Sequence, residues 1–323
     1  MTFSHMVSSL LKDNRRPGSD SARCIQEILD CRATLRDNRL RNRFLKELLT
    51  KYSHAQRKLT ALNRQLSERQ ERLDDDLQAA AGIQKSLLPL NPPRILGLDI
   101  SWRFVPSESI GGDVFNIFLL DEHHLGIYVL DVSGHGVQAA LVTVSVSQML
   151  LPHTGLVVRK NPASASGSDI TCPREVMELL DREYPLERFD KFFSMIYIVL
   201  DVRDGSFAIC NAGHMPALVF RRDGRMEKLK RGGTVIGLGG IVPFEQQNEM
   251  LYKGDRLLLY TDGVTDFMNS RQELFGKDRF IRIAGSLQNM PLEEMVNGIY
   301  EAMMAFGDGF PIQDDISILG IAR

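Results

Sequence analysis

A heptad repeat of apolar residues limits what the first part of this chain can fold into. The repeat keeps one register, with no Gly or Pro before Gly82, and the residues between its apolar positions are mostly Arg, Lys, Glu and Gln. Its a and d positions are Leu45, Leu48, Tyr52, Ala55, Leu59, Leu62, Leu66, Leu73, Ala80, Ile83 and Leu87. Such a narrow apolar seam favours a coiled coil, and therefore a partner helix.

Two polar residues interrupt this seam. Arg69 and Asp76 occupy consecutive d positions. Polar groups there weaken a coiled coil while they fix its register or its partner. We therefore expect a dimerising or signal-carrying helix whose weak central section an input can tighten or loosen. The alternative is a helix that packs only on its own domain.

The sequence changes character at Asn91-Pro92-Pro93, where the prolines stop the helix. We place a domain boundary here. The predicted organisation is a helical, dimerising and regulatory region over residues 1–78, the end of a linker helix over 79–90, and one domain over 91–323.

Short apolar or alternating segments fill the last of these regions, which is typical of strands. Strands are predicted over residues 98–105, 113–120, 125–132, 192–202, 206–212, 217–220, 245–252, 255–260 and 316–322. Helices are predicted over 137–151, 173–184, 277–287 and 292–306, with Thr171 as a cap and a flexible loop over 161–168. Because these blocks do not alternate as βαβ units, the pattern predicts an α+β fold: an antiparallel β-sandwich flanked by helices and preceded by the coiled-coil region.

Composition excludes several classes. The hydrophobic fraction of 43% and the charged fraction of 25% are those of a globular protein. A formal net charge of −2 argues against binding to nucleic acid, and the basic residues of the first ninety positions are interspersed with acidic ones, as on a solvated helix.

The cysteines and the hydropathy suggest a compartment. Four cysteines (Cys24, Cys31, Cys172 and Cys210) are scattered without a C-x-x-C pair, which suits a reducing environment. No apolar run reaches the length of a membrane span, and the N-terminus lacks the apolar core of a signal peptide. We expect a cytoplasmic protein.

Four acidic points each stand at the end of a predicted strand. Asp113 follows two glycines, Asp131 precedes a tight turn, Asp262 follows one strand, and Asp314-Asp315 precede the last one. Carboxylates gathered at one sheet edge suit hard divalent cations. Two such ions can activate a water for attack on phosphorus, and Asp131 is the natural bridge between them.

Here the chain resembles a known family, the PPM (PP2C-like) protein serine/threonine phosphatases of the SpoIIE/RsbU type. The resemblance covers about residue 79 to the C-terminus. Its motifs are A-A-x-I-Q-x-S-L-L-P from Ala80, G-G-D from Gly111, D-V-S-G-H-G from Asp131, N-A-G-H-x-P from Asn211, G-D-x-L-x-L-Y-T-D-G-V-T from Gly254 and D-D-I-S from Asp314. The family fold is a central antiparallel β-sandwich with helices on both sides, an αββα arrangement.

The resemblance implies the roles of the acidic residues. Asp113 and Asp131 would be ligands of two Mn²⁺ or Mg²⁺ ions, together with the Val132 carbonyl. Asp262 and Asp314 would complete the shell of the second ion. Asp315 would stand behind these ligands.

Three polar residues near the motifs are kept outside this set. Asn116 replaces an acidic residue of many relatives and is expected to be a weak ligand at best. His135 is an alternative general acid that the family does not require. His214 is expected to be a buried, hydrogen-bonded histidine in preference to a catalytic acid.

The predicted function is a metal-dependent phosphatase regulated through its N-terminal helix. By resemblance, its substrate is a phosphoserine or phosphothreonine on a STAS-domain anti-sigma-factor antagonist, and an activating protein binds residues 1–78. The alternatives are a catalytically weak phosphoprotein-binding module and a coiled-coil scaffold.

Overall fold

The computed structural model describes residues 38–89, 95, 97–107, 110–134, 136–163 and 167–323. The chain divides into two compact units, Met1–Leu73 and Asp74–Arg323. Across the described ranges, no helix combines the length and the apolar character that crossing a membrane requires.

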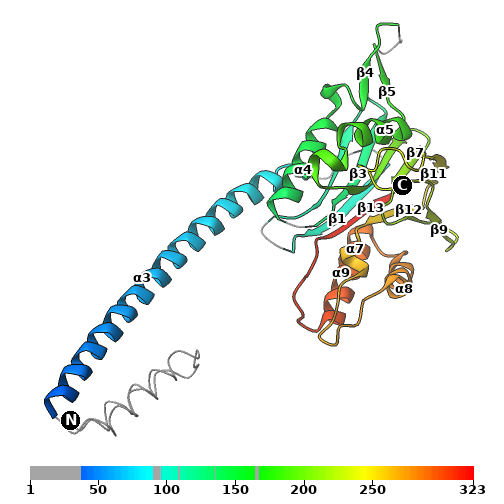
Figure 1. Ribbon diagram of the computed structural model, residues 1–323. Coiled ribbons are helices and arrows are strands. Elements are labelled where there is room, and N and C mark those ends of the chain that lie inside the picture. The colour runs from blue at the N-terminus through cyan, green and yellow to red at the C-terminus, as the bar shows by residue number, and fades with distance from the viewer. Residues whose placement is uncertain (1–37, 90–94, 96, 108–109, 135, 164–166) are drawn as a thin grey trace. The chain divides into compact units, whose positions relative to one another are not determined.

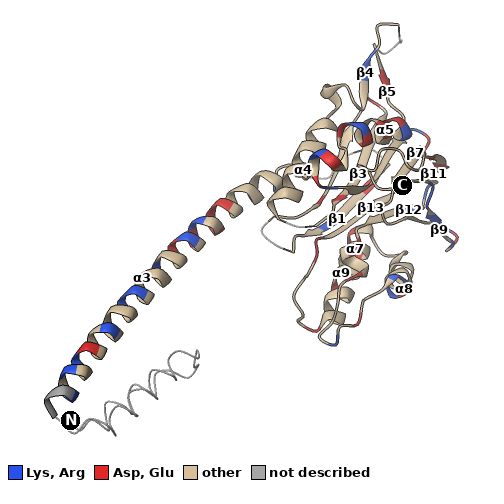
Figure 2. Ribbon diagram, in the orientation of Figure 1, with Lys and Arg blue, Asp and Glu red and all other residues tan. Residues whose placement is uncertain are grey.

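One long helix, α3 (Asn38–Lys85), carries the heptad seam (Figure 1). Basic and acidic residues are interspersed along it (Figure 2). Five large side chains of the seam are 47–64% exposed: Tyr52, Leu59, Leu62, Leu66 and Leu73. These five side chains of α3 are exposed, as the seam of a helix that packs against a partner would be in the absence of that partner.

Two sheets form most of the second unit, and their strands pair antiparallel except for β10, which runs parallel to β7. The first has the strand order β1-β13-β12-β8-β9 and the second β10-β7-β6-β3-β2, with β11 also on β7. The strands are β1 (Asp99–Val105), β2 (Asp113–Leu119), β3 (His124–Val132), β6 (Phe193–Asp201), β7 (Ser206–Ala212), β8 (Ala217–Phe220), β9 (Met226–Leu229), β10 (Gly232–Gly233), β11 (Gln246–Met250), β12 (Arg256–Tyr260) and β13 (Ile316–Ala322).

Helices cover the outer face of each sheet (Figure 1). They are α4 (Val137–Met149), α5 (Pro173–Glu183) and α6 (Leu186–Phe189) on one side, and α7 (Asp262–Thr265), α8 (Lys277–Leu287) and α9 (Leu292–Gly307) on the other. Between α4 and α5 lie the short helix η1 (Pro152–Thr154) and a small hairpin of β4 (Val158–Lys160) and β5 (Ser168–Ile170).

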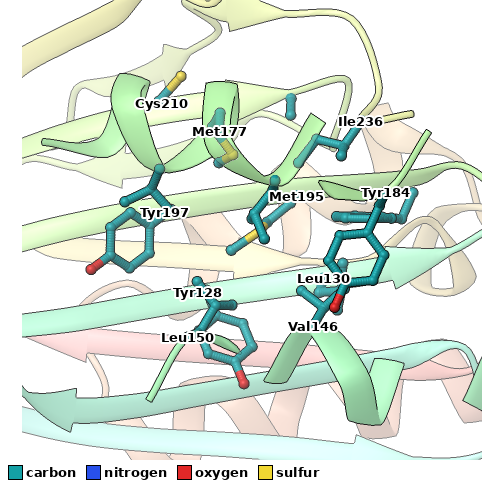
Figure 3. Packing of buried hydrophobic residues seen from close by; sticks show 14 of the residues in the cluster. Tyr128, Leu130, Val146, Leu150, Met177, Tyr184, Met195, Tyr197, Cys210 and Ile236 are labelled. Atoms are coloured by element: carbon teal, nitrogen blue, oxygen red, sulfur yellow. The ribbon is translucent and has the colours of Figure 1, made fainter. Parts of the chain in front are cut away.

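Three buried clusters hold these layers together. The central one joins the two sheets, with Phe115 and Ile196 from one sheet against Leu319 from the other. A second lies under α4 and α5, where Figure 3 shows Met177 of α5 and Val146 of α4 with Tyr128, Leu130, Met195 and Tyr197 of the sheet. The third lies under α8 and α9. The predicted α+β sandwich with flanking helices is confirmed.

Several local predictions differ from the structure. Thr171 is not the cap of α5, because Cys172 holds that position and makes no side-chain capping bond. The loop expected over 161–168 follows β4 and extends one residue too far, because Ser168 begins β5; residues 164–166 lie outside the described residues. The helix α3 ends at Lys85, so Leu87 leaves the seam and packs on the cluster under α4.

Candidate metal centre

Each predicted acidic residue stands at the end of a strand, and the strand pairing brings these ends to one edge of the sandwich. Asp113 begins β2 and lies directly opposite Asp131 in β3. In the other sheet β12 and β13 run antiparallel, so Asp262, just after β12, lies beside Asp314 and Asp315, just before β13.

One hydrogen bond joins the two sheets at this edge. The Ser317 hydroxyl donates to Oδ2 of Asp113 at 2.9 Å. Ser317 belongs to β13 and Asp113 to β2, so the bond ties the two acidic edges together. Sequence reasoning did not single out Ser317, although it stands within the D-D-I-S motif.

Asp315 uses its carboxylate for protein contacts. Its Oδ1 accepts hydrogen bonds from the Ser107 backbone N–H at 2.8 Å and from the Ser107 hydroxyl at 3.0 Å. Its Oδ2 accepts the backbone N–H of Asp113 at 3.1 Å. The residue is 2% exposed. These contacts fix the backbone that carries Asp113, while the expected place of Asp315 behind the metal ligands stays a prediction.

Burial and mutual repulsion set the electrostatics of the site. Burial, followed by the charges of Asp131 and Asp315, raises the pKa of Asp113 well above its ordinary value. Burial also raises the pKa of Asp131 to about 7, and the charge of Asp262 adds to this rise. The pKa values of Asp262 and Asp314 are raised as well, first by burial. Gathered carboxylates of this kind are stabilised by a bound cation.

The donor set fits hard divalent cations. Within the described ranges, no three His, Cys, Asp or Glu side chains converge closely enough to enclose an ion by themselves. Mg²⁺ is commonly held by one or two carboxylates and completes its shell with waters, so it does not need a closed protein cage. Carboxylates in facing pairs with a neighbouring carbonyl suit that chemistry, whereas zinc prefers nitrogen and sulfur.

The backbone at Gly112 approaches the predicted carbonyl ligand closely. A β-carbon built on Gly112 would lie 2.7 Å from the Val132 carbonyl oxygen and 3.1 Å from that of Gly134. The Thr143 hydroxyl of α4 donates to the Gly112 carbonyl at 2.8 Å, and the Val132 N–H donates to the same oxygen at 3.3 Å. Only glycine fits here, and the turn that follows Asp131 is thereby pressed against the start of β2.

The end of α3 reaches the same place. The Gln84 amide nitrogen donates to the Gly111 carbonyl at 2.7 Å, and the Gly111 N–H donates to Gln84 Oε1 at 3.1 Å. Gln84 is 7% exposed. Gln84 is the Q of the A-A-x-I-Q motif. The motif therefore included this residue, but it did not predict that Gly111 is its hydrogen-bond partner. Asn116, doubtful as a ligand, instead donates to the Leu87 carbonyl at 3.1 Å and anchors the segment that follows α3.

Two histidines were the remaining sequence candidates. His214 is 8% exposed, and its Nδ1 lies 2.6 Å from the Ser194 hydroxyl oxygen. Burial lowers its pKa to about 4, which agrees with a neutral, buried histidine. His135 lies outside the described residues. Asp266 was missed: it stands four positions after Asp262, and its charge raises the pKa of Asp262.

Two facing antiparallel sheets between helical layers, with carboxylates along one edge, define the PP2C-like class of fold. A solved structure, the SiaA-PP2C domain of Pseudomonas aeruginosa, is similar with a TM-score of 0.64 and 23% identity, over 79% of this chain and 98% of that one. Residues 121–323 match the family described as Stage II sporulation protein E (SpoIIE). The chain belongs to this family.

Two curated relatives cover a larger part of the chain. Phosphoserine phosphatase RsbU of Bacillus subtilis is 26% identical over 259 residues, which are 79% of this chain and 72% of RsbU. Protein IcfG of Synechocystis is 26% identical over 263 residues, 77% of this chain, but the chain spans only 41% of its length. Both matches extend beyond the SpoIIE segment towards the N-terminus.

Proposed function

We propose that the chain is a metal-dependent protein serine/threonine phosphatase. The observation that carries the proposal is the meeting of Asp113 and Asp131 from one sheet with Asp262 and Asp314 from the other at a single edge. The similarity to phosphoserine phosphatase RsbU supports the substrate class.

The chain's own residues divide the work as follows. Asp113, Asp131, Asp262 and Asp314, with the Val132 carbonyl, would hold two Mn²⁺ or Mg²⁺ ions. Asp315 and Ser317 orient Asp113 through its backbone N–H and its carboxylate. Bound, the two ions supply an activated water and neutralise charge on the phosphoryl oxygens. A phosphorus–oxygen bond to the water forms, the bond to the serine or threonine oxygen breaks, and that oxygen takes up a proton.

The proposal includes a partner and a mode of regulation. The substrate is a phosphorylated STAS-type anti-sigma-factor antagonist, as in the regulatory systems that the family resemblance indicates. The open seam of α3 supports a homodimer through a coiled coil. An activating protein would act on residues 1–78, and the Gln84–Gly111 contact would carry its effect to Asp113. The unpaired thiols of Cys172 and Cys210 support a cytoplasmic location.

The test is release of inorganic phosphate from a phosphoserine protein with and without MnCl₂. Manganese-dependent release that Asp131→Ala abolishes is expected. Tight binding of the phosphoprotein without turnover would favour the binding module instead. If the protein neither bound nor dephosphorylated the phosphoprotein, the coiled-coil scaffold would be the remaining alternative.

A further inference from the structure

A lysine lies beside the turn that follows Asp131. A β-carbon built on Gly134 would lie 3.1 Å from the Nζ atom of Lys191. The carbonyls of Gly134 and Val132 both border Gly112, the residue before Asp113. The ammonium group of Lys191 therefore stands at the turn that carries the proposed main-chain ligand.

The backbone of this lysine is fixed by the same turn. The Ser133 N–H donates to the Phe192 carbonyl at 2.9 Å, and the Phe192 N–H donates to the Ser133 hydroxyl oxygen at 3.2 Å. One residue further on, Phe193 pairs with Val132 in the register of β6 and β3. The backbone of Lys191 thus lies two residues before the start of the central strand β6, next to a residue that is bonded to the turn.

The charge of Lys191 has no structural use in the described part of the chain. None of the ion pairs or hydrogen bonds found among those residues involves its ammonium group, and the side chain is half-buried. Another lysine, Lys277, differs in this respect, because its charge lowers the pKa of Asp262. A half-buried cation that has no carboxylate partner among the described residues, beside the turn that follows Asp131, is available for an anion.

We propose that Lys191 binds the phosphoryl group of the substrate, which deepens the proposed phosphatase function and rests on it. A phosphoserine carries a charge of about −2 at neutral pH and three acceptor oxygens. The carboxylates that would hold the metal ions repel such a group. The Lys191 ammonium offsets this repulsion from beside the turn that follows Asp131 and donates a charge-assisted hydrogen bond to a non-bridging oxygen.

This role separates Lys191 from the metal ligands. A phosphate-binding lysine should control the affinity for phosphoryl groups and leave the binding of the cations unchanged. A lysine that merely supports the turn should affect folding and metal binding together. Lys253 offers a matched control, because it is exposed and precedes β12, at the opposite end of that strand from Asp262.

The experiment compares wild type, Lys191→Met, Lys191→Arg and Lys253→Met with p-nitrophenyl phosphate in MnCl₂, with inorganic phosphate as inhibitor. Loss of one charge-assisted hydrogen bond lowers kcat/KM by about 10- to 100-fold. We expect this loss in Lys191→Met, a similar weakening of phosphate inhibition, substantial recovery in Lys191→Arg, and no change in Lys253→Met. Calorimetric titration should show unchanged Mn²⁺ binding in all four proteins.

Unchanged kcat/KM and phosphate inhibition in Lys191→Met would overturn the inference, as would a parallel loss of Mn²⁺ affinity and melting temperature. Failure of the phosphatase function gives a different result: the wild type would show no manganese-dependent turnover. In that case calorimetric titration of the manganese-loaded protein with inorganic phosphate decides the role of Lys191 by itself, since the inference requires weaker phosphate binding in Lys191→Met.

Discussion

The side chain of Gln84 makes two hydrogen bonds with the backbone of Gly111, one in each direction. The amide of Gln84 thus pairs with Gly111 as a second strand would. Gly111 is two residues before Asp113, so the end of α3 holds the backbone that carries a proposed metal ligand.

Replacing Gln84 by alanine should weaken this connection. The Gly111 N–H and carbonyl would lose their buried partners, which costs about 2 kcal/mol. We expect Gln84→Ala to lower phosphatase activity and to shift half-maximal activation to a higher MnCl₂ concentration. Gln78→Ala is the matched control, because Gln78 is exposed on the same helix. An equal effect of both variants would mean that the helix acts only through its general stability.

The close approach of the Val132 carbonyl to Gly112 leads to a second prediction. The β-carbon of Gly112→Ala would push against the Val132 carbonyl, so the turn must shift. Overpacking of this kind costs about 1–3 kcal/mol, and we expect manganese-dependent activity to fall further than stability does. Thermal unfolding and initial rates measure the two effects.

Gly285→Ala provides the comparison for Gly112. Gly285 lies in α8 with nothing within 4 Å of its added β-carbon. Replacing a helical glycine there should stabilise the protein by about 0.5–1 kcal/mol without changing its rate. A normal rate in Gly112→Ala would exclude Val132 from the proposed ligands.

The pKa of Asp131 predicts how stability depends on pH when metal is absent. The folded-state pKa is raised to about 7 from 3.8, first by burial. A carboxyl with a raised pKa stabilises the fold while it is protonated, and that stabilisation is lost as pH rises from about 4 through about 7. In EDTA the melting temperature should therefore fall across this range, and Asp131→Asn should flatten the fall. An equally steep fall in the variant would assign the effect to another group.

Metal addition should reverse this dependence. Divalent cations bind the ionised carboxylates, so MnCl₂ should raise the melting temperature more at pH 8 than at pH 5. Asp131→Asn should lose most of this rise.

The fold was predictable from local patterns because each strand of the sandwich is short and bounded by turn residues. The pairing of Asp113 with Asp131 was predictable because two short strands joined by a tight turn form a hairpin, and this pattern is easy to recognise in a sequence. The neighbouring carboxylates Asp314 and Asp315 could not be distinguished by pattern alone. Their difference arises from Ser107, whose contacts with Asp315 join residues more than two hundred positions apart.

The contacts of Gln84 and Asn116 likewise could not be predicted from the sequence. Both side chains donate to backbone carbonyls. Every residue has a backbone carbonyl, so a sequence motif cannot indicate which one is the acceptor. Leu87 fitted the heptad spacing, yet tertiary packing removed it from the helix. Periodicity predicts which face of a helix is apolar, but it does not predict where packing on a sheet ends that helix.

Asp315 and Asp314 should respond differently to the same substitution. Asp315→Asn places an amide group where the carboxylate now accepts the N–H groups of Ser107 and Asp113, so at least one buried donor loses its partner. We expect a loss of about 1–3 kcal/mol in stability with or without metal. Asp314→Asn should instead stabilise the metal-free protein, because burial raises the pKa of Asp314, and should abolish activity. Metal-free unfolding curves that coincide for the two variants would contradict this division of roles.

The open seam of α3 predicts self-association. Leu66 is 64% exposed and occupies an a position, so Leu66→Glu places a charge in the centre of the proposed coiled coil. Light scattering should show a dimer for wild type and a monomer for the variant. Ser67→Glu adds the same charge at the adjacent b position, outside the seam, and should remain a dimer.

A four-residue insertion near Arg69 should leave the dimer intact, because the seam is already interrupted at Arg69 and Asp76. It should change the basal phosphatase rate, since it shifts the helix register that reaches Gln84. A basal rate equal to that of the wild type would mean that α3 only links the two regions and does not regulate activity.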